Sequence, residues 1–333
     1  MQSMDLKRSS KRKETNVSKK VLITSRSFGQ INDDPTNVLL EAGYEITLKG
    51  KDFNQEEFEQ IVPEYDALII GAHPFPEEVM EKCSKLQIIC KHGAGLDNIH
   101  LEKAKELGIT VCNVPGTNSN AVADLAFGLM LACSRNIVLS DKRVRNGEWK
   151  PAIGSDVCYK TLGLLGFGAI AKNVARRAKG FGMKVLAYDP YVTEVPEEFK
   201  EYVTLGSCDE VIKGCDILSA HLPLTEETRN MVSAKEMAGM KKGAYIVNTA
   251  RGGIVNENDL YDALVSGQIA AAALDVSDKE PMEMENPLRS LENVIITPHI
   301  GMYSKEAIGA VSLICAQNAA AKISDGELQF KVV

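Results

Sequence analysis

The sequence predicts an α/β protein in which two doubly wound parallel sheets, each covered by helices on both faces, form two domains. The first observation behind this prediction is that short apolar runs alternate with amphipathic segments from residue 21 onward, as in parallel strands joined by helical crossovers. The second is length, because 333 residues are enough for two domains that each bury a core. The third is a glycine-rich strand, turn, helix and strand unit at residues 163–190.

The first half of the chain contains five strand-like runs. They are Val21–Thr24, Glu45–Leu48, Ala67–Ile70, Ile88–Lys91 and Thr110–Asn113. Helical periodicity separates them near Asn37–Ala42, Glu56–Val62, Glu77–Lys82 and Leu101–Leu107. A Pro-Gly loop at residues 114–118 then marks a candidate hinge. The following helix, Ala121–Arg135, is apolar over most of its circumference, which predicts burial in a domain or subunit interface.

The second half repeats the alternation. After the glycine-rich unit, whose second strand is Met183–Tyr188, strands are expected at Ile217–His221, Ala244–Asn248, Ala270–Asp275 and Val294–Ile296. A last helix is expected over Lys305–Ile323. We therefore expect a second doubly wound sheet.

The glycine-rich unit has the features of a dinucleotide site. Gly166 suits a tight turn, Gly168 lets the backbone approach a pyrophosphate, and Ala171 keeps helix and strand close. Free N–H groups at the helix start would hold the phosphates. Asp189, about twenty residues beyond the turn, is placed to bind the ribose 2′-hydroxyl and to repel the extra phosphate of NADP. The glycines alone also suit an ordinary tight turn, but the full order of elements favours NAD.

Composition restricts the partners. The net charge of −7 gives no reason to expect a nucleic acid. Residues 1–19 are basic without periodicity, which predicts a disordered tail more simply than a nucleic-acid arm. No apolar run follows this basic start, and the most apolar stretch, 121–133, carries Asp124, so neither a signal peptide nor a membrane span is expected. We expect a small-molecule substrate, with no nucleic acid and no membrane.

The cysteines point to a reducing environment. All eight are scattered, and no Cys-x-x-Cys pair occurs. This pattern is typical of small core residues in a cytoplasmic protein, and it predicts neither a disulfide framework nor a metal site.

Ligands of open parallel sheets bind beyond the carboxyl ends of the strands. In the second sheet these ends lead to the Gly166 loop, Asp189, His221–Pro223, Thr249–Arg251, Asp275 and Pro298–His299. His299 is the natural acid/base, because histidine titrates near neutrality. Arg251 suits a carboxylate, and Glu280 is placed to hydrogen-bond the imidazole. Each has an ordinary structural interpretation by itself, but together on one rim they favour catalysis.

The first domain offers a weaker candidate. The small residues Gly93, Ala94 and Gly95 at a strand's carboxyl end would expose backbone N–H groups to a carboxylate, although a simple tight turn explains them equally well. Four other histidines are given no catalytic role, namely His73, His92, His100 and His221. Of these, His92 and His221 lie near the expected cleft and are interpreted as structural.

At this point the motifs resemble those of a known family. The matching blocks are Gly93-Ala94-Gly95-x-Asp97-Asn98, Pro115-Gly116-x-Asn118, Gly166-x-Gly168-x-x-Ala171, His221-x-Pro223-Leu224-Thr225, Asn248-x-Ala250-Arg251-Gly252, Leu274-Asp275-Val276 with Glu280-Pro281, and Pro298-His299-Ile300-Gly301. Over about residues 20 to 333 the chain resembles the D-isomer-specific 2-hydroxyacid dehydrogenases, and among them the phosphoglycerate dehydrogenases most.

The resemblance implies a Rossmann NAD-binding domain, residues 117–300, inserted into a flavodoxin-like substrate-binding domain, residues 20–116 and 301–333. It also implies a homodimer built largely on the NAD domains. The implied catalytic residues are Arg251, Glu280 and His299. The implied NAD contacts are Gly166, Gly168, Ala169, Ile170, Asp189, Pro223, Thr249, Ala250, Arg251, Asp275, His299 and Gly301. The implied substrate contacts are Gly93, Ala94, Gly95, Arg251 and His299.

One departure concerns the substrate. The loop at residues 71–74 lacks the Arg-Ser-x-Thr pattern whose arginine reaches the substrate phosphate in many phosphoglycerate dehydrogenases. Lys91 and Arg26 are the alternative cations. We rank D-3-phosphoglycerate and 3-phosphohydroxypyruvate, the serine-biosynthesis pair, first, and glyoxylate or hydroxypyruvate second. A different class, a dinucleotide-sensing interaction protein, shares this fold. Formate dehydrogenases are disfavoured, because they use glutamine where Glu280 stands.

Overall fold

The computed structural model describes residues 18–49 and 53–333. These residues form two compact units, one ending at Pro115 and resuming at Gly309, the other spanning Gly116–Ile308. Of the predicted basic tail, residues 1–17 lie outside the described residues, and Lys19 already begins the first strand. The sequence analysis assigned residues 301–308 to the first domain, whereas the structure groups them with the second unit.

The first unit contains a five-stranded sheet in the order β2-β1-β3-β4-β5, and every pairing is parallel. Its strands are β1 (Lys19–Ile23), β2 (Tyr44–Leu48), β3 (Ala67–Ile70), β4 (Ile88–Lys91) and β5 (Thr110–Cys112). Its helices are α1 (Asp34–Glu41), α2 (Gln55–Ile61), α3 (Glu77–Met80), α4 (Leu101–Glu106) and most of α11 (Lys305–Ile323).

The core of this unit follows from apolar strands that face helices on both sides. All four residues of β3 are buried, as expected for a central strand of a parallel sheet. One face packs Leu22, Leu68 and Ile89 against the α2 residue Phe58. This packing fixes the strands so that the loops following them share one edge.

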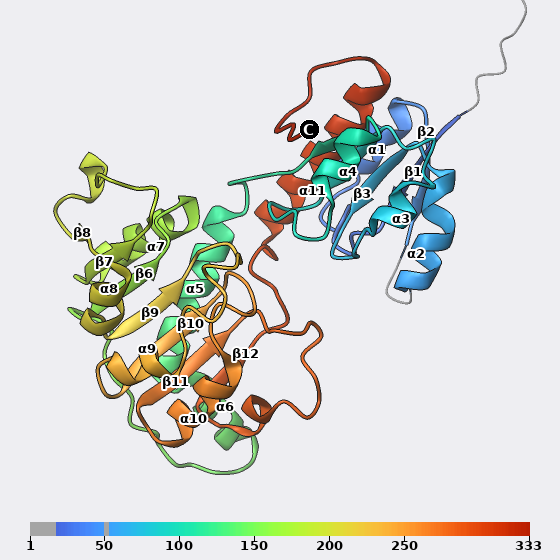
Figure 1. The fold of residues 1–333 in the computed structure, drawn as a ribbon. Coiled ribbons are helices and arrows are strands. Elements are labelled where there is room, and N and C mark those ends of the chain that lie inside the picture. Colours follow the sequence, from blue (N-terminus) through green and yellow to red (C-terminus); the bar gives the residue numbers. More distant parts are fainter. Residues whose placement is uncertain (1–17, 50–52) are drawn as a thin grey trace, which may run out of the picture. The chain divides into compact units, whose positions relative to one another are not determined.

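The second unit contains a seven-stranded parallel sheet in the order β12-β11-β10-β9-β6-β7-β8. Its strands are β6 (Thr161–Leu165), β7 (Lys184–Tyr188), β8 (Val203–Leu205), β9 (Ile217–Ala220), β10 (Ala244–Asn248), β11 (Ile269–Leu274) and β12 (Val294–Ile296). Its helices are α5 (Ser119–Ser134), α6 (Ile137–Arg145), α7 (Ala169–Gly180), α8 (Cys208–Gly214), α9 (Ala234–Gly239) and α10 (Glu257–Val265). Figure 1 shows helices on both faces of this sheet.

Two cores cover the two faces of the seven-stranded sheet. Residues of α5 and α7 pack with one set of strand side chains, and residues of α8, α9 and α10 pack with the other. Between β6 and β9 the direction of strand addition reverses, because β7 and β8 extend the sheet one way and β9 to β12 the other. Such a reversal opens a crevice at the carboxyl edge.

The two predicted parallel sheets are confirmed. The sequence analysis missed β8 and α6 for physical reasons. β8 is a three-residue edge strand whose burial varies from residue to residue. No residue of α6 is buried, and its apolar residues Ile137, Val138 and Val144 are about half exposed, so the helix has no buried apolar face.

No single helix of the described residues has the length and apolar composition needed to cross a membrane. The bent pair α5 and α6 passes that test only when its two helices are taken together.

Candidate active site

The turn after β6 is shaped by two glycines with different surroundings. Gly166 has φ +92°, and an added Cβ would lie 2.7 Å from the carbonyl oxygen of His221, so any side chain there would collide with backbone. At Gly168, which precedes the first residue of α7, an added Cβ would meet nothing within 4 Å. The turn is therefore closed toward the sheet and open at the start of the helix.

Asp189 follows β7 and stabilises this turn. Its Oδ2 accepts a hydrogen bond from Phe167 N at 2.8 Å, and its Oδ1 accepts one from Tyr191 N at 2.9 Å. Each carboxylate oxygen can accept a further hydrogen bond. The carboxylate is thus fixed beside the glycine turn with capacity left for hydroxyl groups.

Unpaired polar groups on the same edge fit a polar ligand. No side chain caps the start of α7, so its first amides are available to an anion. At the ends of β10 and β9, the buried atoms Thr249 Oγ1 and His221 Nδ1 have no hydrogen-bond partner among the described residues. Burial lowers the pKa of His221 to about 4, so the ring is neutral at physiological pH. A dinucleotide's phosphates and hydroxyls match this set of groups.

His299 and Glu280 form a hydrogen-bonded pair after β12 and β11. The distance from His299 Nδ1 to Glu280 Oε2 is 2.8 Å, and 49% of the histidine side chain and 41% of the glutamate side chain remain exposed. The other ring nitrogen, Nε2, is then the one left to exchange a proton with a ligand. This is the geometry of an oriented acid/base.

Asp275 holds the loop that carries His299. This aspartate is 1% exposed, and its carboxylate accepts from Thr297 Oγ1 at 2.6 Å and from the amides of Ile300 and Gly301 at 2.8 Å. His299 itself has φ +53°, an uncommon conformation that costs roughly 1–3 kcal/mol unless its surroundings impose it. Hydrogen bonds on both sides of His299 supply that constraint. Burial raises the pKa of Asp275 against the opposing effect of these hydrogen bonds.

Glu280 is held in its ionised form. Partial burial acts to raise the pKa of this carboxyl, but the hydrogen bond and charge of His299, the amide of Ser277 and the charge of Arg251 together outweigh burial. The pKa of Glu280 consequently lies below its ordinary value. The carboxylate is therefore charged near neutrality and is available to hydrogen-bond His299 Nδ1.

The segment carrying Arg251 is shaped by Asn248 at the end of β10. Asn248 donates from Nδ2 to the Arg251 carbonyl at 2.8 Å and accepts from the Ala250 amide at 3.0 Å. The guanidinium donates to the Ala250 carbonyl at 2.7 Å. Since the charge of Arg251 also acts on Glu280, the structure brings the three predicted catalytic side chains to one region of this edge.

Comparison with known proteins identifies the family of the chain. The sequence pattern of the "D-isomer specific 2-hydroxyacid dehydrogenase, NAD binding domain" matches residues 127–301. The chain belongs to the D-isomer specific 2-hydroxyacid dehydrogenase family. It is therefore an NAD-dependent oxidoreductase, and the predicted family, enzyme class and cofactor are confirmed.

Individual relatives of the family have different names. The chain is 44% identical over 282 residues to a hydroxypyruvate reductase of Thermotoga maritima, covering 83% of this chain and 90% of the relative. It is 39% identical over 317 residues to a D-3-phosphoglycerate dehydrogenase of Methanocaldococcus jannaschii, covering 94% of this chain but only 59% of that relative. Its fold matches the crystal structure of a glyoxylate reductase from Paecilomyes thermophila with a TM-score of 0.81 and 32% identity, covering 95% and 98% of the two chains.

The predicted NAD contacts all belong to the second unit of this dehydrogenase. They lie on the turn after β6, at the start of α7, or just beyond the ends of β7, β9, β10, β11 and β12. Two of them bear carboxylates that already accept hydrogen bonds from the chain itself, Asp275 three and Asp189 two. Asp275 is the more fully occupied of the two. Its contact with NAD stays a prediction, as does the role of every other residue in the set.

The predicted substrate loop, Gly93–Gly95, belongs to the first unit and follows β4. Gly93 has φ +146°, and its carbonyl accepts from the amide of Val114 at 2.9 Å. The Ala94 carbonyl accepts from Asn113 Nδ2 at 2.7 Å. With these carbonyls held by the segment after β5, the loop has a defined shape.

The two candidate cations of the first unit differ in their surroundings. Lys91 donates from Nζ to the Gly71 carbonyl at 2.6 Å and to Asn98 Oδ1 at 2.7 Å. Arg26, in the loop after β1, is exposed. Burial and the nearby charge of Arg26 both lower the pKa of His73, which follows β3. Arg26 is thus the more accessible cation, and its charge affects His73 in the loop after β3.

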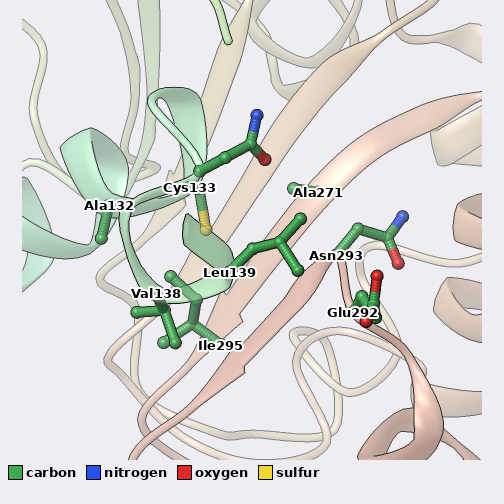
Figure 2. Close-up of a pocket in the computed structure, with 9 residues that line it drawn as sticks. Ala132, Cys133, Val138, Leu139, Ala271, Glu292, Asn293 and Ile295 are labelled. Atoms are coloured by element: carbon green, nitrogen blue, oxygen red, sulfur yellow. The ribbon is translucent and has the colours of Figure 1, made fainter. Parts of the chain in front are cut away.

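Figure 2 shows a depression elsewhere on the second unit. It is lined by Ala132, Cys133, Asn136, Val138, Leu139, Ala271, Glu292, Asn293 and Ile295. None of these is a predicted site residue, and Ala271 lies in the amino-terminal half of β11, whereas Asp275 follows its carboxyl end. Among the described residues, no group of three or more His, Cys, Asp or Glu is arranged to hold a metal.

Sequence reasoning missed several residues that shape the site. Asn248 was assigned only to the end of a strand and to a matching motif, and Thr297 was given no role, although each directly follows or ends a strand at the carboxyl edge. Asp278 and Glu257 were also missed. Their partners lie 21 to 25 residues away along the chain, so no local pattern reveals them.

Proposed function

We propose that Arg251, Glu280 and His299 are the catalytic residues of this D-2-hydroxyacid dehydrogenase. The observation that carries the proposal is the 2.8 Å hydrogen bond between His299 and Glu280 within reach of the Arg251 charge, on the edge that holds the glycine turn. NAD, when bound, supplies the acceptor or donor of a hydride at substrate C2.

The residues of the chain move the proton and hold the substrate. In oxidation His299 Nε2 accepts the hydroxyl proton, and in reduction it returns that proton to the ketone oxygen. Glu280 stabilises the imidazolium. Arg251 binds the substrate carboxylate and polarises the adjacent oxygen through paired hydrogen bonds. We also propose that the amides of Gly93–Gly95 bind the substrate, which makes the five-stranded unit the substrate-binding domain.

D-3-phosphoglycerate and 3-phosphohydroxypyruvate are the substrates that we propose first. The support is Arg26, an exposed guanidinium at the carboxyl edge of the five-stranded sheet, which suits a phosphate through bidentate hydrogen bonds. The phosphoglycerate dehydrogenase relative adds to this support.

Hydroxypyruvate and glyoxylate form the second candidate pair. Two observations favour them. The loop after β3, Gly71-Ala72-His73-Pro74, contains no arginine, and the 44% identical relative is a hydroxypyruvate reductase.

A substrate panel decides between the pairs. The purified protein is supplied with NADH and with phosphohydroxypyruvate, hydroxypyruvate, glyoxylate or pyruvate, and kcat/KM is measured from the loss of NADH absorbance. A strong preference for phosphohydroxypyruvate supports the first proposal. A preference for an unphosphorylated ketoacid supports the second. No turnover on any of the four would contradict both.

We also propose that the protein is a homodimer joined through its NAD domains. Large apolar side chains are exposed between residues 137 and 159, and Trp149 and Ile153 are 91% and 98% exposed. Several large apolar side chains exposed in one segment are typical of a protein interface. Trp149→Glu with Ile153→Glu should therefore halve the mass measured by light scattering, and an unchanged mass would contradict the proposal. The cytoplasmic location stays a prediction from the cysteine pattern.

A further inference from the structure

The segments that carry Arg251 and Glu280 are joined by hydrogen bonds of residues that take no part in the proposed proton and hydride transfer. Asp278, two residues before Glu280, accepts a hydrogen bond on Oδ1 from the amide of Gly253 at 2.6 Å. Gly253 is two residues beyond Arg251 and is buried. One carboxylate thus connects the segment after β11 to the segment after β10.

A second carboxylate supports the same connection from the first turn of α10. Glu257 accepts from the Asp278 amide on Oε1 at 2.8 Å and from Asn286 Nδ2 on Oε2 at 2.6 Å. The amide and the carboxylate of Asp278 are therefore both bound to residues 253–257. Two hydrogen bonds at one residue restrict both the distance between the two segments and the rotation of one segment against the other.

The two backbones are also in direct contact. An added Cβ at Gly252 would overlap the carbonyl of Ser277. Glycine is required here because the segments pass too closely for a side chain. Within the Glu280 segment, Ser277 donates from its amide to Glu280 Oε1 at 3.3 Å and from Oγ to the Lys279 carbonyl at 2.7 Å. The segment around Glu280 is thus stabilised by hydrogen bonds within itself and by contacts with residues 252–257.

We propose that Asp278 is a positioning residue that, with Glu257, fixes the Arg251 segment against the Glu280 segment. Its function rests on the catalytic roles proposed above. Arg251 must hold the substrate carboxylate while Glu280 orients His299, so the relative position of the two segments sets the position of substrate C2 and oxygen relative to the imidazole. Displacement of one segment by about 1 Å reduces turnover by up to about a hundredfold in enzymes that depend on such alignment.

The test compares Asp278→Ala with Asp278→Asn. Both variants remove the charge, but Asn keeps an oxygen that accepts from the Gly253 amide. We expect Asp278→Ala to lower kcat for ketoacid reduction about tenfold, with little change in the Kd for NADH. We also expect the pH at which its reduction rate falls by half to move lower, because Glu280 is less well held against His299. Asp278→Asn should restore both quantities to near wild-type values.

Glu257→Ala provides a second variant, since it removes the acceptor of the Asp278 amide and should shift kcat and the pH profile in the same direction. Asp262→Ala, which removes an exposed aspartate from the same helix, is the matched control. Wild-type kcat and pH profile in folded Asp278→Ala, checked by Tm, would overturn the proposal. So would an equal loss in Asp278→Asn, because charge rather than the hydrogen bond would then be responsible. Failure of the catalytic assignment is separate, since His299→Ala would then retain full turnover.

Discussion

The carboxyl edges of the two sheets are constructed differently. At the edge of the seven-stranded sheet, side chains connect one loop to the next. Asp275 binds the loop after β12, Glu280 binds His299, and Asp278 binds the segment after β10. The loops that carry the proposed chemistry are therefore constrained by one another.

At the edge of the five-stranded sheet, side chains bind the carbonyls of neighbouring loops and shape those loops. Lys91 and Asn98 both donate to the Gly71 carbonyl, at 2.6 and 3.2 Å. Arg26 stays exposed. This edge has a defined backbone but presents an accessible cation.

The difference separates two requirements of an enzyme that transfers a hydride. Proton transfer and hydride transfer need fixed distances, which interlocked loops provide. Recognition of a distal substrate group tolerates a mobile side chain, because a charge acts over a longer range than an aligned proton transfer. Substitutions at the first edge should accordingly change turnover most, and substitutions at the second should change apparent affinity for particular substrates.

The largest effect is expected at His299. His299→Ala should lower kcat roughly a hundredfold or more, the scale of general acid–base catalysis, while the Kd for NADH stays nearly constant. His100 offers a matched control, because its Nδ1 lies 3.0 Å from Glu77 Oε1 in an exposed pair. Stopped-flow reduction of a ketoacid measures turnover, and fluorescence titration measures NADH binding. Equal turnover in His299→Ala and wild type would refute the assignment.

Glu280→Gln should have the next largest effect. The neutral amide no longer stabilises the imidazolium of His299, so kcat should fall about tenfold, the effect of losing a carboxylate that orients a histidine. The pH at which reduction falls by half should move lower, because the pKa of Glu280 is lowered in the wild type and the lost charge is present throughout the working range. Glu77→Gln is the control. A pH profile identical to that of the wild type would contradict a role for the Glu280 charge.

Much of the fold could be predicted because most of the parallel strands are apolar runs bounded by turn residues. Residues Ala67–Ile70 show this signal most clearly, since all four are buried. β8 and α6 lack the signal, the first because it is a short edge strand and the second because no residue of it is buried. The predicted domain boundary at residue 301 differs from the division into compact units, in which residues 301–308 stay with the second unit and Gly301 is hydrogen-bonded to Asp275.

In the site, too, local sequence patterns select some residues and do not select others. His299, Arg251 and Glu280 could be proposed as catalytic from the sequence because the carboxyl-edge rule and local motifs select them. Asp278 was not found, because its importance depends on Gly253, which lies 25 residues away along the chain. The sequence also assigned Asp275 to NAD, whereas its buried carboxylate accepts three hydrogen bonds from the loop around His299. Local patterns therefore identify groups that perform chemistry better than groups that position them.

A substitution of Asp189 tests the proposed NAD contacts at the carboxyl edge of the seven-stranded sheet. Asp189→Ala removes the proposed ribose acceptor and the partner of the Phe167 amide, so the Kd for NADH should rise about tenfold, the equivalent of one charge-assisted hydrogen bond. NADPH should bind better than it does to the wild type, because the carboxylate no longer repels the extra phosphate. Fluorescence titration with each cofactor measures both changes. An unchanged ratio of the two Kd values would contradict the role of Asp189 in selecting NAD.

The smallest effect is expected at the less constrained edge. Arg26→Ala should raise KM for phosphohydroxypyruvate about fivefold, since an exposed ion pair contributes about 1 kcal/mol, and added salt should shrink the difference from wild type. KM for hydroxypyruvate should not change, because that substrate lacks the phosphate. Arg145→Ala is the control, as Arg145 is exposed and paired with Asp141 on α6. An equal rise for both substrates would show that Arg26 supports its loop rather than recognising phosphate, and the two edges would then differ less than their hydrogen bonds indicate.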